Sequence, residues 1–214
     1  MFVMADVALQ RIIEIGLENL KADNTSFNDI FGTYLEPEMS ADYGQAYIDK
    51  IRDWFADVKL PVVQSFALNT TQHPCFSIHL ASTSEDEAKA AMGDHFGDVN
   101  TDAVGVAVYT VNVDIGVHAS KQGDYAIWLY YILTYILFKE KLMAERFGLR
   151  LQSLNASDFD KDSKYLADNV WTRWCRVRCT TQNHWDQQVN PTLTKTKFNV
   201  SFGRVGDEDD DFTI

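Results

Sequence analysis

The chain has 214 residues, of which 46% are hydrophobic and 23% are charged, and its formal net charge is −12. This length and composition suffice for one domain with a sizeable core. The acidic total disfavours tight binding to nucleic acid, because affinity for phosphate depends mostly on lysine and arginine. Three cysteines are too few, and odd in number, for a disulfide framework, which favours a reduced compartment.

The charge is unevenly divided along the chain. Residues 1–120 hold 18 acidic and 6 basic side chains, and residues 121–206 hold 8 acidic and 13 basic ones. The run DEDDD at 207–211 adds five further negative charges. This division suits subunits that associate head to tail, acidic face against basic face; two differently solvated surfaces on one subunit are the alternative.

The first 59 residues are expected to be largely helical. Apolar residues at helical spacing predict an amphipathic helix over 7–20 and a second helix over 45–58, which Pro61 ends. Between them, residues 23–44 contain the turn formers glycine and proline and are predicted to be a partly ordered loop.

Two strands are expected next, over 60–68 and 75–81, joined as a hairpin by the polar connection NTTQHP. Ser84, followed by three acidic residues, resembles the N-cap of a short helix. The stretch GDHFGDVNTD that follows is punctuated by glycine, which predicts a loop.

The unit 104–148 determines the predicted architecture. Apolar residues alternate over 104–117 with one change of phase, which predicts a long strand with a bulge near Tyr109 and Thr110. A helix follows, with Asp124 as its expected N-cap and Gly148 at its C′ position. Its uncharged run 125–138 covers only roughly 21 Å, against about 30 Å of bilayer hydrocarbon, so we expect a buried helix rather than a membrane span.

Three more extended segments are expected, over 149–154, 170–180 and 195–205, with a polar loop before the second. The predicted fold is therefore α+β: a mixed or mostly antiparallel sheet flanked by helices, with one long apolar central helix. We expect a single domain over 1–206, made of the helical portion 1–59 and the sheet with its central helix over 60–206. The acidic tail 207–214 is expected to be flexible.

The strongest candidate for catalysis or metal binding is the GDHFGD cluster of Asp94, His95 and Asp98, since carboxylates beside an imidazole can orient it or share a cation. A solvated loop with a satisfied histidine is the alternative, and it is preferred. The five histidines lie in unrelated segments, and their spacing does not match that of metal ligands, so structural or surface roles are expected. We therefore expect no enzyme activity, no metal and no cofactor.

Two further patterns favour metal binding only weakly. Cys175 and Cys179 would point the same way along a strand, but roughly 13 Å apart, which is too far to share one metal. The alternating carboxylates Asp158, Asp160 and Asp162 resemble the start of a calcium loop that lacks its glycine and its terminal glutamate.

Aromatic and cationic residues interleave near the end of the predicted sheet. On a strand, Trp171 and Arg173 would share one face with Cys175, while Trp174 and Arg176 share the other with Arg178. Tryptophan and arginine are favoured interface anchors, which makes these residues candidates for subunit contact; base stacking on nucleic acid is the alternative. The candidate interface residues are Trp171, Arg173, Trp174, Arg176 and Arg178.

The acidic tail is a second candidate contact. Its charge could bind divalent ions loosely or meet a basic partner, and solvated charge that aids solubility is the alternative. The candidate partner-contact residues are Asp207, Glu208, Asp209, Asp210 and Asp211.

The order of these elements resembles the tail terminator and neck proteins of tailed bacteriophages. The similarity lies mainly in residues 60–180, where a long strand leads to a helix containing WLY, an L-x-A-S-D loop at 154–158 and a V-W-x-R turn at 170–173 before the final strand. In that family the resemblance implies a small ring-forming subunit, usually sixfold with a dodecamer as the alternative, that caps the tail tube and lets DNA pass without tight binding.

The resemblance further implies a virion location, after assembly in the host cytoplasm. It implies partners among tail-tube, sheath and head-connector proteins, and no membrane. The long N-terminal helical portion and the DEDDD tail depart from a minimal terminator, and a sheath, a collar or a neighbouring ring are candidates for their contacts. The alternatives are a head-completion or tail-tube subunit, and a metal-dependent enzyme centred on Asp94, His95 and Asp98.

Overall fold

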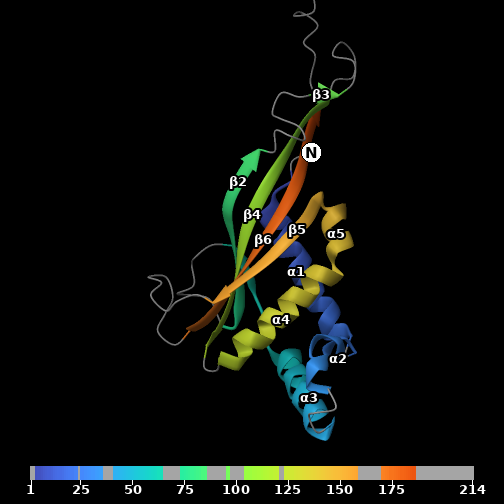
Figure 1. The fold of residues 1–214 in the computed structure, drawn as a ribbon, viewed down its shortest axis with the longest axis vertical. Helices are drawn as coiled ribbons and strands as arrows, with labels where there is room; N and C mark the ends of the chain where they lie inside the picture. Colours follow the sequence, from blue (N-terminus) through green and yellow to red (C-terminus); the bar gives the residue numbers. More distant parts are fainter. Residues whose placement is uncertain are drawn as a thin grey trace, which may run out of the picture.

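A layer of helices packs on one face of a twisted sheet (Figure 1). The computed structural model describes residues 3–23, 25–35, 41–64, 73–85, 95–96, 104–120, 123–158 and 170–186. The helices are α1 Ala5–Ala22, α2 Ser26–Ile30, the 3-10 turn η1 Gly32–Leu35, α3 Ala41–Asp57, α4 Gly123–Lys139 and α5 Lys141–Arg146. The strands are β1 Val62–Gln64, β2 Cys75–Glu85, β3 His95–Phe96, β4 Val104–Ser120, β5 Leu149–Asp158 and β6 Val170–Asp186.

The sheet is mixed, with five strands in the order β1-β2-β4-β6-β5 and the short β3 paired to β4 beside this path. The α+β class and the mixed sheet of the prediction are confirmed. The predicted hairpin is wrong, because β1 and β2 run parallel, with Val62 opposite Phe76. A hairpin consists of two antiparallel strands, which β1 and β2 are not.

The predicted bulge in the long central strand is also wrong. β4 pairs with β6 in unbroken register over 17 residues, and the only shift beside β4 lies in β2, between Leu80 and Ser82. The change of phase in the sequence has another cause. Val108 lies on the face away from the helices, whereas Val111 and Val113 face them, so two apolar series occupy opposite faces of one continuous strand.

The predicted central helix is not continuous. It breaks at Glu140 into α4 and α5, which lets α5 pack against β5 and bury Ala144. The expected C′ glycine is confirmed: Gly148 has a φ of +78° and donates its N–H to the Glu145 carbonyl. At the other end Asp124 lies inside the first turn of α4 rather than before it. None of the helices in the described residues is both long and apolar enough to cross a bilayer.

Two other local predictions are corrected. Ser84 is not a helix cap but part of β2, and its hydroxyl lies 3.5 Å from the Thr110 carbonyl, to which it donates. Part of the expected loop 23–44 is helical, because Phe27 and Phe31 are buried one turn apart and Phe27 packs edge-on against Phe55 at 5.3 Å. The predicted strand 195–205 lies outside the described residues.

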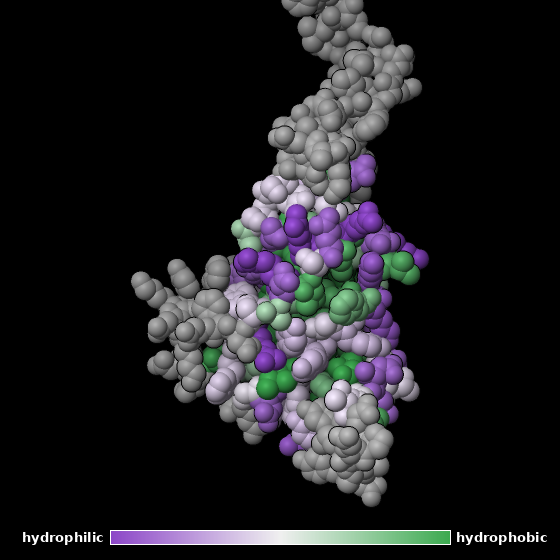
Figure 2. Space-filling view, viewed as in Figure 1, coloured by the Kyte–Doolittle hydropathy of each residue, from purple (hydrophilic) through white to green (hydrophobic). Residues whose placement is uncertain are grey.

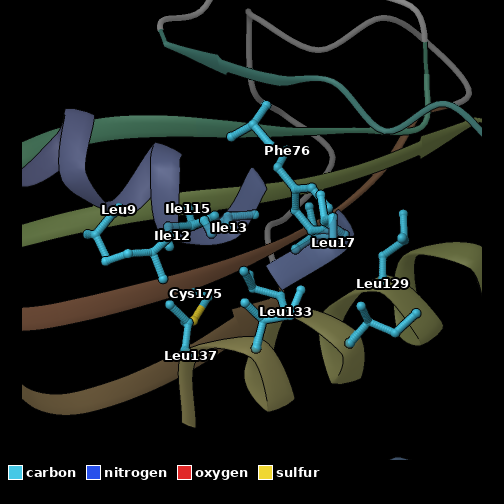
Figure 3. Close-up of a cluster of buried hydrophobic side chains, with 14 of the residues drawn as sticks. Leu9, Ile12, Ile13, Leu17, Phe76, Ile115, Leu129, Leu133, Leu137 and Cys175 are labelled. Carbon is cyan, nitrogen blue, oxygen red and sulfur yellow. The ribbon is translucent and has the colours of Figure 1, made fainter. Parts of the chain in front are cut away.

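The core lies between the helix layer and the sheet (Figure 3). One stripe of α1 meets one stripe of α4 above the inward-facing residues of β2, β4 and β6. The two helices approach closely at Gly16, where an added Cβ would overlap the side chain of Ile136. The labelled core residues are Leu9, Ile12, Ile13, Leu17, Phe76, Ile115, Leu129, Leu133, Leu137 and Cys175.

Candidate functional site

The face of the sheet that points away from the helices carries polar side chains on its three central strands, β2, β4 and β6. Residues directly opposite each other in a sheet share a face, so the register places Ser77, Gly116 and Trp174 in one row across β2, β4 and β6. His118 and Thr172 form the next row on β4 and β6. We call this surface the open face; its polar members are Ser77, His79, Asn112, Asp114, His118, Thr172, Arg176 and Arg178.

A chain of short polar contacts connects the three central strands on this face. Ser77 Oγ lies 2.7 Å from His118 Nε2 and 3.0 Å from His79 Nε2. The other ring nitrogen of His118, Nδ1, lies 2.9 Å from Thr172 Oγ1. One set of neutral tautomers satisfies every contact: His79 Nε2–H donates to Ser77, Ser77 donates to His118 Nε2, and His118 Nδ1–H donates to Thr172.

Gly116 makes room for this network. It lies between Ser77 and Trp174 in register, and the imidazole of His118, two residues along β4, leans over it toward Ser77. A Cβ at Gly116 would overlap both His118 Nε2 and Ser77 Oγ. The hydrogen bond between Ser77 and His118 therefore depends on a residue without a side chain at this position.

The network is held neutral by burial. Desolvation is the largest cause that lowers the pKa of His118, to about 3, and the neighbouring His73 and His79 lower it further. Desolvation also lowers the pKa values of His73 and His79 themselves. The rings of His73 and His118 are 6.3 Å apart, so a second charge there would meet the first in a poorly solvated environment.

A serine hydroxyl bonded to an imidazole is the pairing that enzymes use to activate a nucleophile. Here, however, Ser77 and His118 are fully buried, so a substrate cannot reach the hydroxyl oxygen without displacing neighbouring residues. What the arrangement does is join β2, β4 and β6 in one register through two side-chain hydrogen bonds between strands, while the contact between His79 and Ser77 lies within β2. Sequence reasoning missed this cluster, because His118 is far along the chain from His73 and His79 and meets them only through the pairing of β4 with β2.

The candidate interface residues of β6 divide between the two faces. On the open face, Trp174 packs its ring 5.4 Å from His79 and 5.8 Å from His118. Beside it, Arg176 donates two hydrogen bonds to the Asp114 carboxylate, at 2.6 and 2.8 Å. Arg178 is exposed on the same face.

On the helix side of β6 lie the other two candidates. Trp171 packs over Gly123 at the start of α4, where a Cβ would sit 3.4 Å from the indole, and it keeps about half of its surface exposed. Arg173 lies over the ring of Tyr130, 5.4 Å from the centroid. The five candidates therefore do not form one continuous surface, although each lies on the face that strand alternation predicts.

An exposed apolar surface that the sequence analysis did not single out runs along the outer side of α4 and α5. Phe138 and Leu142 are 69% and 73% exposed, and Ile127 and Tyr131 continue the row along α4. We call these four residues the α4–α5 stripe; hydrophobic side chains reach the surface in this region in Figure 2. The signal was present in the sequence: these positions lie opposite the buried stripe of a helix that is apolar on all sides.

The sequence-predicted metal candidates are not assembled by the described residues. Asp94 and Asp98 lie outside them, as do Asp160, Asp162 and the acidic tail 207–211; His95 falls in β3, and its side chain is not described. Among the residues that are described, no group of three histidine, cysteine or acidic side chains could hold a metal ion. Cys175 and Cys179 point into the core, where burial raises their pKa values to about 12 and 11.

No model of a known protein family matches this chain, and no curated protein sequence matches it. The two motifs that carry the phage resemblance nevertheless meet in space. L-x-A-S-D occupies the end of β5 and V-W-x-R the start of β6, with Ser157 opposite Trp174 and Asp158 opposite Arg173. These motifs thus form one corner of the sheet.

Proposed function

We propose that this chain is a structural subunit of a tailed-phage neck or tail end, which assembles with copies of itself into a ring around the DNA path. Its functional event is the burial of surface between subunits, not turnover of a substrate. The observation that carries the proposal is the α4–α5 stripe, a row of large apolar side chains left at the surface of a folded subunit.

Exposed apolar rows of this kind favour association. Single exposed apolar residues are common on proteins, but contiguous apolar patches mark surfaces that bind another protein or a membrane. Ile127, Tyr131 and Phe138 follow one another along α4, and Leu142 continues the row on α5, as anchors in a groove of a partner do. If the α4–α5 stripe packs against a second copy of the chain, these side chains are removed from water.

Two further features support a ring of subunits rather than another assembly. The acidic residues concentrate in 1–120 and the basic residues in 121–206, a division that suits a head-to-tail interface repeated around a closed ring. An overall charge of −12 suits a conduit to which passing DNA does not adhere.

The first test is the oligomeric state of the purified full-length chain, measured by sedimentation velocity and native mass spectrometry over a concentration series. We expect a closed oligomer for the wild type and mostly monomer for the double variant Phe138→Ser, Leu142→Ser. Leu80→Ser removes a similarly exposed apolar side chain from β2 and serves as the matched control, which we expect to assemble normally.

The second test is position in the particle. Labelled antibody against the chain, imaged on intact virions, is expected to mark the head-to-tail junction or the tail end. Label along the whole tail would instead indicate a tail-tube subunit, and label within the head shell would contradict the proposal. A wild-type chain that remains monomeric at every concentration and is absent from particles would overturn it.

A further inference from the structure

The outer edge of β5 offers a place for another strand. Among the described residues β5 pairs only with β6, so the backbone N–H and C=O groups on its other side have no ladder partner there. Such an edge is a template for an added strand. β5 lies on the same flank of the sheet as α5, which packs against it and carries Leu142 of the α4–α5 stripe (Figure 1).

The sequence contains a segment whose pattern matches this edge. In 195–205 the apolar residues Phe198, Val200 and Phe202 alternate with Lys197 and the polar residues between them, which is typical of a strand with one apolar face. The side chains of β5 are divided in the same way between an apolar face and a polar face. Leu151 and Leu154 are half-buried on its helix side, whereas Arg150, Ser153 and Asn155 are exposed on its open face.

We propose that the segment 195–205 of one copy of this chain adds to β5 of a second copy as an antiparallel strand. Apolar residues of the segment would extend the helix-side core over Leu151 and Leu154, and its polar residues would continue the open face. The inference rests on the proposed self-assembly and names the element through which neighbouring subunits are connected.

Charge decides the direction of the added strand. An antiparallel strand ends beside Leu149, so the following run DEDDD at 207–211 would lie near the guanidinium groups of Arg146 and Arg150, with Glu145 as a nearby carboxylate. A parallel strand would end beside Asp158, whose charge offsets that of Arg173 opposite it, so the five acidic residues would meet a less basic end of β5. Opposite charges favour the antiparallel arrangement.

Chain length decides that the edge belongs to another copy. Along β6, Asp186 is thirteen residue steps from Arg173, the partner of Asp158, which is about 43 Å at 3.3 Å per residue. Nine steps from Asp186 to residue 195 span at most about 32 Å, too little to start an antiparallel strand beside Asp158 of the same chain. A strand antiparallel to β5 is parallel to β6, so in the same chain it would also need a crossover of about a dozen residues or more, and only eight residues lie between Asp186 and residue 195.

Cross-linking between differently tagged copies tests the contact directly. Full-length Ser153→Cys protein is mixed with full-length Asn199→Cys protein, denatured together, refolded and treated with a short bismaleimide. We expect a covalent dimer that contains both tags. Ser82→Cys replaces an exposed serine on β2, at the other side of the sheet, and is expected to give no mixed dimer with Asn199→Cys.

A backbone substitution supplies an independent measurement. Proline cannot donate to a strand ladder, so Val200→Pro in the full chain is expected to raise the concentration for half-assembly about tenfold or more. Thr192→Pro, outside the segment, is the matched control and is expected to assemble like the wild type. Neither substitution touches the described fold.

The outcomes separate the two proposals. A wild-type ring that is unaffected by Val200→Pro and gives no mixed cross-link would overturn the strand addition while leaving the ring proposal intact. With both cysteines in one chain, as in the double variant Ser153→Cys, Asn199→Cys, a cross-link confined to monomers would overturn the assignment to a second copy. A full-length chain that never assembles and never cross-links would overturn both.

Discussion

The imidazole of His118 lies over Gly116 and brings its Nε2 atom within 2.7 Å of the Ser77 hydroxyl. This contact spans from β4 to β2, and the Nδ1 contact to Thr172 continues it to β6. The three strands are thereby connected by side chains as well as by the backbone ladder. Since all these groups are buried or half-buried, changes to them act on stability rather than on a solvent-facing site.

Substitution of Gly116 by alanine is expected to destabilise the fold. The new Cβ would overlap His118 and Ser77, so the network must shift or break, at a cost of about 1–3 kcal/mol in the free energy of unfolding. Urea titration monitored by tryptophan fluorescence measures this difference. Gly32→Ala is the control, because a Cβ there meets no atom within 4 Å, and an unchanged Gly116→Ala midpoint would contradict the packing described for His118.

Acidification is expected to destabilise the protein through the histidine cluster. The folded-state pKa of His118 is about 3, below the value of 6.5 for an unperturbed histidine, so the unfolded chain takes up its proton first as the pH falls. The contribution of neutral His118 to the free energy of unfolding is complete above about pH 6.5 and is lost progressively toward pH 3. Unfolding free energies measured between pH 7 and about pH 4 check the sign.

The variant His118→Gln identifies the source of that pH dependence. It retains a polar side chain but removes the titrating group, so stability should vary less with pH between about 6.5 and 4 than in the wild type. This window lies above the range in which Asp23 titrates, whose pKa is lowered to about 2 by hydrogen bonds from Thr25 and Ser26. An identical slope in both proteins would show that other groups control the acid sensitivity.

The close contact between α1 and α4 is expected to make the fold sensitive to substitution at Gly16. Gly16→Ala is expected to cost about 1–3 kcal/mol, because the added methyl group would overlap Ile136 in the core. Ile136→Ala removes Cγ2 and Cγ1, the two side-chain atoms that lie nearest to that Cβ. The double variant should therefore be more stable than the sum of the two single effects implies, and strictly additive thermal denaturation data would argue against this close approach.

The three described thiols are expected to be unreactive in the folded protein. Cys75, Cys175 and Cys179 are fully buried, and burial raises their pKa values to about 12, 12 and 11. Reaction with a thiol-specific chromogenic disulfide should be slow under native conditions and release three equivalents after unfolding. Fast release of even one equivalent without denaturant would contradict the buried placement.

Local patterns predicted those elements whose environment is the same along their whole length. Helical spacing in 7–20 predicted α1, alternation in 170–180 predicted the faces of β6, and the glycine stop predicted the C′ position of Gly148. Where the environment changes within an element, the patterns misled. The two valine series of β4 fall on opposite faces because helices cover only one of them, which in the sequence resembled a bulge.

The sequence by itself determined the class of fold, the long central strand and the uncharged helix after it, since these follow from propensity and periodicity over neighbouring residues. Only the tertiary structure decided that β1 lies parallel to β2, that His73, His79 and His118 meet, and that Phe138 and Leu142 remain at the surface. Each of these depends on which distant segments pair or pack. Strand pairing brings residues 41 positions apart within hydrogen-bonding distance, as it does for Ser77 and His118, and no local pattern in the chain specifies that pairing.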